Sequence, residues 1–405
     1  MRRAVLASAL ALAACADAPD PSSTPSTDPP AEASRPAVGE VATPADSGAV
    51  APRLAVGIDG TLVLSWAEPD GSGHALRYAR WTGAGWSEAE TADSGTGLVV
   101  NGSDTPGVVP LRDGLLAHAL LAHAGASHAY DATVRQSSAD GPWDAADLLN
   151  TDGVAAEHGF VSAVPRADGG ADVVWLDGRQ QGAGHGHHAG AMTLRAVTLD
   201  SDGARRDETE LDARTCDCCP TAAAATASGL VVAYRDRSEA EIRDVAVVRR
   251  VDGVWTEPMI PHADGWHIEG CPVNGPALAS RGDRVALAWF TAAGDTSRVW
   301  LAVSEDGGAT WGERERIDGG SPIGRVGVAM LDDGSPVVSW LEGVGDAAEV
   351  RVRRVGGAGD RNASQTVATV DAGRSSGIPR VAALGDRALV AWTDASSVRT
   401  AVVAP

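Results

Sequence analysis

A unit of about 50 residues recurs seven times along this chain, and repeats of that period are typical of propellers and related arrays. In each copy an apolar run ends in an aromatic residue, or once in a histidine, followed by a short polar loop. The intervals run from 51 residues (Trp289 to Trp340) to 59 (Trp175 to Tyr234). The other marker positions are Trp66, His118 and Trp392. Such a period accommodates four short strands, so it predicts a β-propeller of seven four-stranded blades, or of six if the copy at His118 is an insertion.

Composition and proline positions agree with an all-β chain. The 48 Gly and 22 Pro suit many short strands and turns, and 12 Trp supply large side chains for packing between sheets. Proline loses no ladder hydrogen bond at the first residue of a strand, so the prolines that lie 13 or 14 residues before a marker indicate where each inner strand begins. These are Pro52, Pro220, Pro276 and Pro379. The last copy ends after its third strand, and we expect Glu40 to Thr43 to supply the fourth and close the ring.

One turn carries a recognisable motif. Residues 304–311 read SEDGGATW, with Ser304, Asp306, Gly308, Thr310 and Trp311 at the fixed positions of an Asp-box. This segment resembles the Asp-box (BNR) repeat of sialidase-like β-propellers, and worn copies recur elsewhere, so the resemblance covers residues 38–405. The resemblance implies a structural role, in which the motif shapes a tight turn between the third and fourth strands of a blade.

The N-terminal residues predict that the chain is exported to the bacterial cell envelope. Two arginines precede a short apolar run that ends in Leu12-Ala13-Ala14-Cys15, which resembles the lipobox of bacterial lipoproteins. We therefore expect residues 1–15 to be a signal peptide, Cys15 to be lipidated, and residues 16–37 to form a disordered linker rich in Pro, Ser and Thr. Asp17 does not directly follow the cysteine, so an outer-membrane position is favoured, at its periplasmic face or the cell surface, with membrane contact only through the lipid anchor.

Charge excludes several classes of function. The chain has 33 basic and 54 acidic side chains, a formal net charge of −21, and all of its basic residues are Arg. Nucleic-acid binding is therefore not expected. Without lysine, Schiff-base catalysis and a phosphate-binding P-loop are excluded as well.

Four cysteines of the predicted propeller lie in two loops that join consecutive blades: Cys216, Cys218, Cys219 and Cys271. Outside the cytoplasm an even number of cysteines favours two disulfides. The close packing of the first three argues for a soft-metal site instead, with copper preferred because the spacing matches no zinc-ribbon pattern. The candidate histidine ligands are His185, His187, His188 and His267. A catalytic thiol beside imidazole is a third interpretation.

Arginine and carboxylate residues on the same predicted face indicate either a self-neutralised loop or a pocket for an anionic ligand. They are Asp177, Arg179, Arg235, Arg243 and Asp244. Sialidases bind a carboxylate with three Arg and attack through a Tyr, and the nearest counterparts here of the three Arg are Arg53, Arg325 and Arg380. The resemblance then implies Tyr234 as the nucleophile and Asp236 as the acid. The carboxylate that polarises Tyr234 would be Glu239, Glu241 or Glu269.

The sequence therefore predicts an envelope lipoprotein propeller that binds copper or a small anionic or glycan ligand at the mouth of its channel. The CDCC and GCP segments resemble those of a group of bacterial secreted sialidase-like proteins, which implies a shared site. The alternatives are an exo-sialidase-like glycosidase, a Cys or metal redox catalyst, and a scaffold with structural disulfides whose protein partner is unknown.

Overall fold

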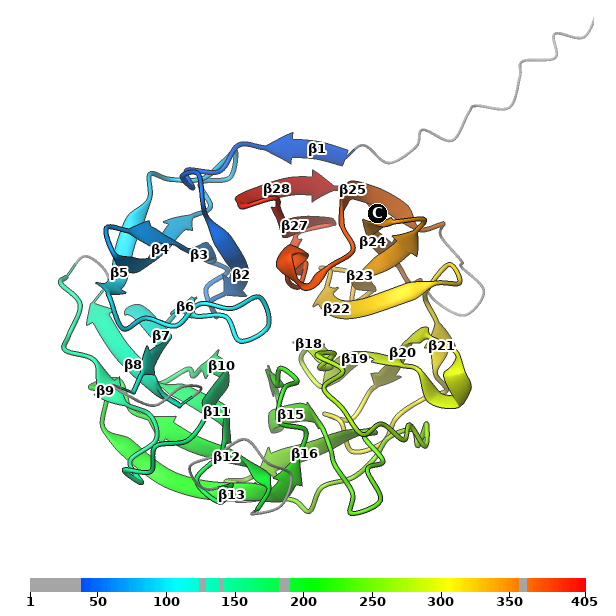
Figure 1. Cartoon of the computed structure of the whole chain (residues 1–405), viewed down its shortest axis with the longest axis horizontal. Helices are drawn as coiled ribbons and strands as arrows, with labels where there is room; N and C mark the ends of the chain where they lie inside the picture. The colour runs from blue at the N-terminus through cyan, green and yellow to red at the C-terminus, as the bar shows by residue number, and fades with distance from the viewer. Residues whose placement is uncertain (1–37, 124–128, 139–140, 182–189, 357–362) are drawn as a thin grey trace, which may run out of the picture. The chain divides into compact units, whose positions relative to one another are not determined.

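Seven antiparallel sheets of four strands each form a ring around a central channel in the computed structural model of the protein (Figure 1). The structure describes residues 38–123, 129–138, 141–181, 190–356 and 363–405. The described residues form one compact unit. The prediction of a seven-bladed all-β propeller is confirmed, and the copy marked by His118 is a complete blade.

Each blade places its first strand beside the channel and its fourth at the rim. Blade 1 contains β2 (Val50–Val56), β3 (Leu62–Asp70), β4 (Gly73–Arg80) and β5 (Glu90–Gly95). Blade 2 contains β6 (Gly107–Pro110), β7 (Gly114–Ala122), β8 (Tyr130–Ser138) and β9 (Asp147–Leu148). Blade 3 contains β10 (His158–Pro165), β11 (Ala171–Asp177), β12 (Met192–Leu199) and β13 (Arg205–Thr215). The next two consist of β14 (Ala222–Thr226), β15 (Gly229–Arg235), β16 (Val245–Val251) and β17 (Val254–Trp255); and β18 (Ala277–Arg281), β19 (Arg284–Thr291), β20 (Arg298–Ser304) and β21 (Glu315–Arg316). The sixth blade contains β22 (Pro322–Met330), β23 (Pro336–Val344), β24 (Ala347–Arg354) and β25 (Gln365–Asp371). The only helical elements in the described ranges are two 3₁₀ turns, η1 (Ala293–Asp295) and η2 (Arg374–Ser376).

The seventh blade joins the two ends of the propeller. Its strands are β26 (Arg380–Leu384), β27 (Arg387–Asp394), β28 (Ser397–Val403) and β1 (Val38–Val41). Val38 pairs with Val403 and Val41 with Thr400, so the N-terminal strand completes the sheet as predicted, although it begins two residues before the expected Glu40. This pairing leaves the last blade with a full set of four strands.

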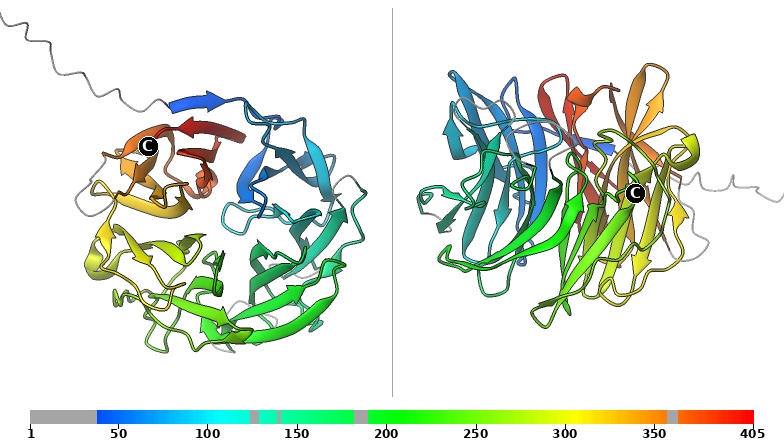
Figure 2. Two further views of the ribbon diagram at one scale, coloured as in Figure 1. Left: turned by 180° about the vertical axis from the view of Figure 1, so that it is seen from behind. Right: turned by 60° about the horizontal axis from the view of Figure 1, so that its bottom comes forward.

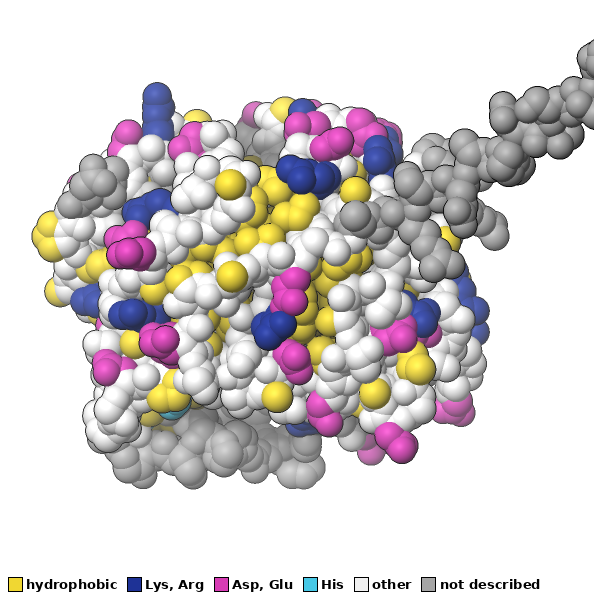
Figure 3. Space-filling model, turned by 90° about the horizontal axis from the view of Figure 1, so that it is seen from above, with side chains coloured by type: hydrophobic (Ala, Val, Ile, Leu, Met, Phe, Trp, Pro, Cys, Tyr) yellow, Lys and Arg dark blue, Asp and Glu magenta, His cyan; other side chains and the backbone are white. Residues whose placement is uncertain are grey.

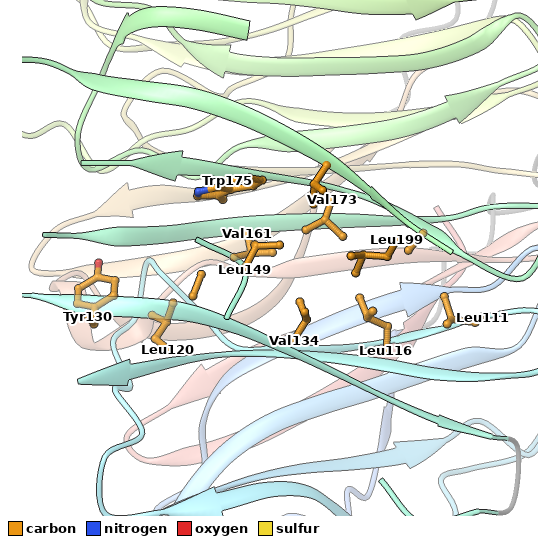
Figure 4. Packing of buried hydrophobic residues seen from close by; sticks show 13 residues of the cluster. Leu111, Leu116, Leu120, Tyr130, Val134, Leu149, Val161, Val173, Trp175 and Leu199 are labelled. Atoms are coloured by element: carbon orange, nitrogen blue, oxygen red, sulfur yellow. The ribbon is translucent and has the colours of Figure 1, made fainter. Parts of the chain in front are cut away.

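The marker aromatics lie in the second strand of each blade and fill the spaces between neighbouring sheets. Figure 4 shows Trp175 of β11 in the layer of aliphatic side chains between blades 2 and 3. Its buried indole N–H donates to Asp177 at 2.8 Å. Trp66 donates in the same way to Glu68, and Trp340 to Glu342. A carboxylate two residues after the marker thus recurs because a buried indole N–H needs an acceptor.

The Asp-box is a structural turn between β20 and β21, as predicted. Asp306 accepts hydrogen bonds from the Ser304 hydroxyl and from the Thr310 N–H, both at 2.8 Å. The Ser304 oxygen accepts from the Gly308 N–H, and Gly308 has a φ of 82° that favours glycine. The hydrogen bonds from Thr310 lower the pKa of Asp306 to about 2. Trp311 lies in the packing between blades 4 and 5.

Residues 1–37, which contain the predicted signal peptide, Cys15 and the linker, lie outside the described residues. Among those that are described, no helix is both long and apolar enough to cross a membrane.

The blades stand side by side around the ring (Figure 2). On the side of the ring in Figure 3, basic and acidic side chains are interspersed, so the net negative charge is not gathered into one patch there.

Candidate functional site

The central channel is a cavity with a volume of about 1130 Å³. The inner strands line it, and turns between the first and second strands, such as those at Gly57, Arg281 and Gly385, surround one end. Polar and apolar surface line it in nearly equal parts, and the apolar part is formed by small residues such as Ala222–Ala225 and Val326–Val328. A channel of this size accommodates a ligand as large as a short oligosaccharide.

Five arginines line this channel, and three of them, Arg53, Arg325 and Arg380, are the ones suggested by the resemblance to sialidases. Arg53 donates to the carbonyls of Thr105 and Val161, both at 3.0 Å. Arg380 donates to the hydroxyl of Thr105 at 3.2 Å, and its buried Nε has no hydrogen-bond partner. The two guanidinium groups therefore meet at Thr105.

Arg325 reaches the channel from a strained position. Its φ of 54° lies in the left-handed region, at an irregularity of β22 where the pairing with β23 shifts. The guanidinium donates to the carbonyls of Gly373 and Gly377 at 2.8 and 3.1 Å. The same irregularity, with a non-glycine residue at positive φ, occurs in β2 at Ala51 and in β10 at Phe160. This irregularity thus recurs near the start of the inner strands β2, β10 and β22.

The charge of these three arginines is compensated only in part, since the charges of Asp104 and Asp371 act on Arg53 and Arg325. None has a carboxylate within ion-pairing distance in the part of the chain that the structure describes. Burial lowers the pKa of Arg53 to about 10, and burial together with the charge of Arg53 lowers the pKa of Arg380 to about 9. Since guanidinium stays protonated in proteins, these shifts report buried positive charge, which Asp104 offsets only in part at Arg53. In a chain with a net charge of −21, the channel is a locally cationic site.

A buried proton-sharing group that the sequence did not reveal lies beside Arg53. The Tyr130 hydroxyl lies 3.1 Å from Asp104 Oδ2 and 2.7 Å from Glu157 Oε1. Asp104 also accepts the Phe160 N–H at 2.7 Å, and burial raises its pKa to about 7. Tyr130 begins β8, the third strand of blade 2, and its hydroxyl meets loops that precede β6 and β10. Only the folded chain brings these three segments together.

The four cysteines gather where blades 3, 4 and 5 meet. Cys216, Cys218 and Cys219 lie in the loop from β13 to β14, and their Sγ atoms lie within 4.8 Å of one another. Cys216 Sγ is 3.1 Å from Cys219 Sγ and 3.9 Å from Cys218 Sγ. All four cysteines are unbridged, and the exposed Cys271 interacts with Cys218. Cys219 directly precedes Pro220 and Thr221, which line the channel.

The cysteine cluster stabilises a thiolate at Cys216. Hydrogen bonds with Cys218 and Cys219 lower the pKa of Cys216, and Arg243 Nη1 lies 3.3 Å from its sulfur. The same hydrogen bonds raise the pKa of Cys218, and burial raises the pKa of Cys219. A thiolate next to thiols and guanidinium groups is the environment of a reactive or metal-binding cysteine.

The predicted Arg/Asp pocket is built mainly of internal contacts. Arg235 is 1% exposed, donates to three backbone carbonyls and stacks on Trp266. Arg243, which contacts Cys216, also donates to Glu241 at 2.8 Å. Asp244 accepts the N–H groups of Gly265 and Trp266. These residues support the loops around the cysteine cluster, whereas Asp177 and Arg179 pair with each other in blade 3.

Of the residues predicted for a sialidase-like mechanism, the structure brings Asp236 near Tyr234 but places no glutamate among the hydrogen-bond partners of the Tyr234 hydroxyl in the described residues. Tyr234 is fully buried between blades 3 and 4, where its hydroxyl donates to Asp212, so it does not meet Glu239, Glu241 or Glu269. Burial raises the pKa of Asp236 to about 6. Glu269 is exposed beside the exposed His267, 4.0 Å away. His267, a predicted metal ligand, is not part of the group formed by Cys216, Cys218 and Cys219. His185, His187 and His188 lie outside the described residues.

Comparison with known proteins finds no matching family model and no matching curated sequence. Solved structures do match. A polysaccharide lyase of family PL25, an ulvan lyase, is 14% identical over 90% of this chain and 96% of its own, with a TM-score of 0.56. The Hadza microbial sialidase Hz136 is 13% identical over 83% of this chain and 74% of its own, with a TM-score of 0.49. An α-L-arabinanase of Penicillium chrysogenum is 12% identical over 91% and 97%, with a TM-score of 0.47. At these identities the likeness concerns architecture alone, and the TM-score of 0.56 shows that the chain shares its β-propeller fold with the ulvan lyase.

Proposed function

We propose that the protein binds a soft transition-metal ion, with Cu(I) favoured, through the thiolates of Cys216, Cys218 and Cys219. The approach of their three sulfur atoms to within 4.8 Å carries this proposal. Two thiolates on one ion with metal–sulfur bonds of about 2.3 Å lie about 3.8 Å apart. The Cys216–Cys218 separation of 3.9 Å fits that edge. The Cys216–Cys219 separation of 3.1 Å is shorter than the edge, yet well beyond a disulfide bond of about 2.05 Å.

The charge around the cluster favours thiolates over a disulfide. Arg243 contacts Cys216, and the charge of Arg235 lowers the pKa of the same thiol. A neutral disulfide gains nothing from two guanidinium groups, whereas an anionic metal–thiolate centre is stabilised by them. If the predicted signal peptide delivers the chain to the oxidising envelope, a bound ion would also protect these thiols from oxidation.

Copper is favoured over zinc because three sulfur atoms converge and the fourth stands apart. Structural zinc sites take four ligands in a tetrahedron, while thiolates also select Cu(I). Cys271 approaches Cys218 but is not within the group of three. A three-thiolate site therefore predicts that Cys271 is dispensable, and a tetrahedral zinc site predicts that it is required.

Cu(I) titration of the reduced protein against a chromogenic Cu(I) chelator tests this difference. We expect one tightly held ion per chain, weakened at least roughly 100-fold in Cys216→Ser and Cys218→Ser, since each change removes a ligand. Cys271→Ser serves as the matched control and should change the affinity by less than about threefold.

Two results would contradict the copper site. Alkylation of the protein in denaturant and chelator without reductant should label four thiols of the propeller, and no labelling would mean two disulfides. Equal loss of affinity in all three variants, with Zn²⁺ held more tightly than Cu(I), would replace copper by a four-thiolate zinc site.

The channel favours a second candidate function, the binding of an acidic sugar. Arg53, Arg325 and Arg380 present guanidinium groups without carboxylate partners to a cavity of about 1130 Å³. The ulvan lyase with the same fold is described as bound to -[GlcA(1-4)Rha3S]-, a chain with carboxylate and sulfate groups. Arg forks suit both anions, so we infer a uronate-bearing or sulfated glycan as the ligand class.

Calorimetric titration with glucuronate and with N-acetylneuraminate tests the channel. Arg380→Met should weaken binding about tenfold or more, because a hydrogen bond to a charged group contributes roughly 1.5–3 kcal/mol. The control is Arg281→Met, at one end of the channel, where Arg281 pairs with Asp332. Binding of neither acid, or an Arg380 variant that binds as the unaltered protein does, would refute the acidic-sugar site.

A further inference from the structure

A second cluster of potential metal ligands lies in blade 3, apart from the cysteines. It joins Asp152 of the loop before β10, His158 at the start of β10 and Asp177 at the end of β11, and one ligand atom of each lies within 4.8 Å of the others. His158 and Asp177 are directly paired across the two strands. Both side chains are fully buried, and that of Asp152 is 8% exposed. The sheet register therefore fixes two of the three ligands.

The orientation of the His158 ring leaves one nitrogen facing two carboxylates. Nδ1 lies 3.3 Å from the carbonyl oxygen of Tyr130, which accepts a hydrogen bond and so places the ring proton on that nitrogen. Nε2 then points its lone pair toward Asp152 Oδ2 at 3.3 Å and Asp177 Oδ1 at 3.7 Å. Neither Nε2 nor Asp152 Oδ2 has a hydrogen-bond partner, and both are buried. Arg179 contacts both carboxylates, with its Nη2 3.3 Å from Asp152 Oδ2 and its Nε 2.7 Å from Asp177 Oδ1, but no donor reaches Nε2. A cation between Nε2 and the two carboxylates would relieve the repulsion of their lone pairs.

The net negative charge of the cluster suits a divalent cation. The carboxylates that face His158 are Asp131, Asp152 and Asp177, and the balancing group is Arg179. Three negative charges and one positive charge sum to −2 when His158 and the neighbouring His123 are neutral. Glu208 lies farther out and is paired with Arg195 and Arg205 as well as Arg179.

The geometry points to a binding site for a divalent ion with nitrogen and oxygen preference, such as Mn²⁺ or Zn²⁺, held by His158 Nε2 and the carboxylates of Asp152 and Asp177. Ligand atoms on an ion with bonds of about 2.1 Å are separated by roughly 3.0–3.4 Å. The measured 3.3 and 3.7 Å are close to this range. One imidazole and two carboxylates suit these ions, whereas Cu(I) prefers the sulfur ligands of the other cluster.

Manganese binding to the purified full-length protein tests this site. After removal of metals with a chelator, Mn²⁺ is titrated and the free ion followed by electron paramagnetic resonance. We expect one ion per chain, with the affinity lowered at least roughly tenfold in His158→Gln and in Asp152→Asn. His123→Gln is the matched control, because His123 pairs with Asp131 on the other side of the His158 ring and should leave Mn²⁺ binding unchanged.

The outcomes separate this site from the copper proposal. Mn²⁺ binding should be unaffected by Cys216→Ser, because thiolates are not its preferred ligands. If His158→Gln fails to give the native near-ultraviolet circular dichroism, Asp152→Asn decides. If the unaltered protein bound neither Mn²⁺ nor Zn²⁺, a proton on Nε2 would join the two carboxylates in place of an ion. If His158→Gln and Asp152→Asn bound Mn²⁺ as tightly as the unaltered protein, the ion would lie elsewhere. Either result would overturn the inference.

Discussion

Replacement of Arg235 by Met should destabilise the propeller by at least about 3 kcal/mol, because three buried carbonyl oxygens would lose their donor at roughly 1 kcal/mol or more each. Arg235 donates to Asn274, Arg243 and Phe290 at 2.8, 2.6 and 2.8 Å. Asn274 and Phe290 belong to the approach to blade 5 and to β19, so this single side chain links blade 4 to blade 5. Chemical denaturation monitored by tryptophan fluorescence would measure the loss.

Arg235→Lys should be nearly as harmful, since an ammonium group cannot reproduce the planar fork that reaches three acceptors. Arg387→Met is the control, because Arg387 is an exposed residue at the start of β27. We expect the control to change stability by less than about 0.5 kcal/mol. If Arg235→Met proved equally mild, the contacts of Arg235 would be incidental, and the residue would be available for the ligand-binding role that its sequence position suggested.

The period of the sequence was sufficient to predict the fold. The regular spacing of the marker residues records the packing between blades, since Trp66, Trp175, Trp289 and Trp340 are all buried at equivalent positions of a second strand. Closure by the N-terminal strand followed from an incomplete last copy. These features are local and repeated, so each blade confirms the interpretation of the others.

Roles at the site were harder to predict because they depend on which loop residues become buried. Asp177 was interpreted as part of an anion pocket, although its position two residues after Trp175 matches Glu68 and Glu342, which accept indole N–H groups. That repeated spacing was a usable signal for a structural role. His158 begins β10 with its side chain fully buried.

Some contacts left no local trace in the sequence. Asp104, Tyr130 and Glu157 come from three loops and strands that only the ring brings together. One signal was present in Gly159, where a Cβ atom would lie 1.9 Å from Asp104 Oδ2. The glycine admits the carboxylate, but its meaning is visible only when both segments are in place.

The buried Asp104 carboxyl offers a test in which pH alone changes stability. Burial, reinforced by the charge of Glu157, raises its pKa to about 7 against the hydrogen bonds of Phe160 and Tyr130. In the protonated form Asp104 donates to the Tyr130 oxygen, and Tyr130 donates to Glu157, which satisfies both short contacts of that hydroxyl. The ionised form would leave two carboxylates competing for one hydroxyl proton.

Since the pKa is about 7 in the folded state and about 3.9 in the unfolded state, the folded protein binds the extra proton between these values. The contribution to stability is therefore complete below pH 4 and is lost as pH rises through 7. Between pH 5 and pH 8 we expect Asp104 to reduce the free energy of unfolding by roughly 2–3 kcal/mol. Urea denaturation across that range measures it.

Asp104→Asn should abolish most of this dependence, because the amide retains an acceptor for the Phe160 N–H and a donor toward Tyr130 while it cannot ionise. At pH 8 the variant should then be at least as stable as the unaltered protein, an unusual result for substitution of a buried residue. Asp386→Asn, in the exposed turn before β27, should leave the dependence intact. An unchanged pH profile in Asp104→Asn would show that Asp104 is ionised throughout, and Arg53 would then have a carboxylate counterion, which would weaken the case for an anion in the channel.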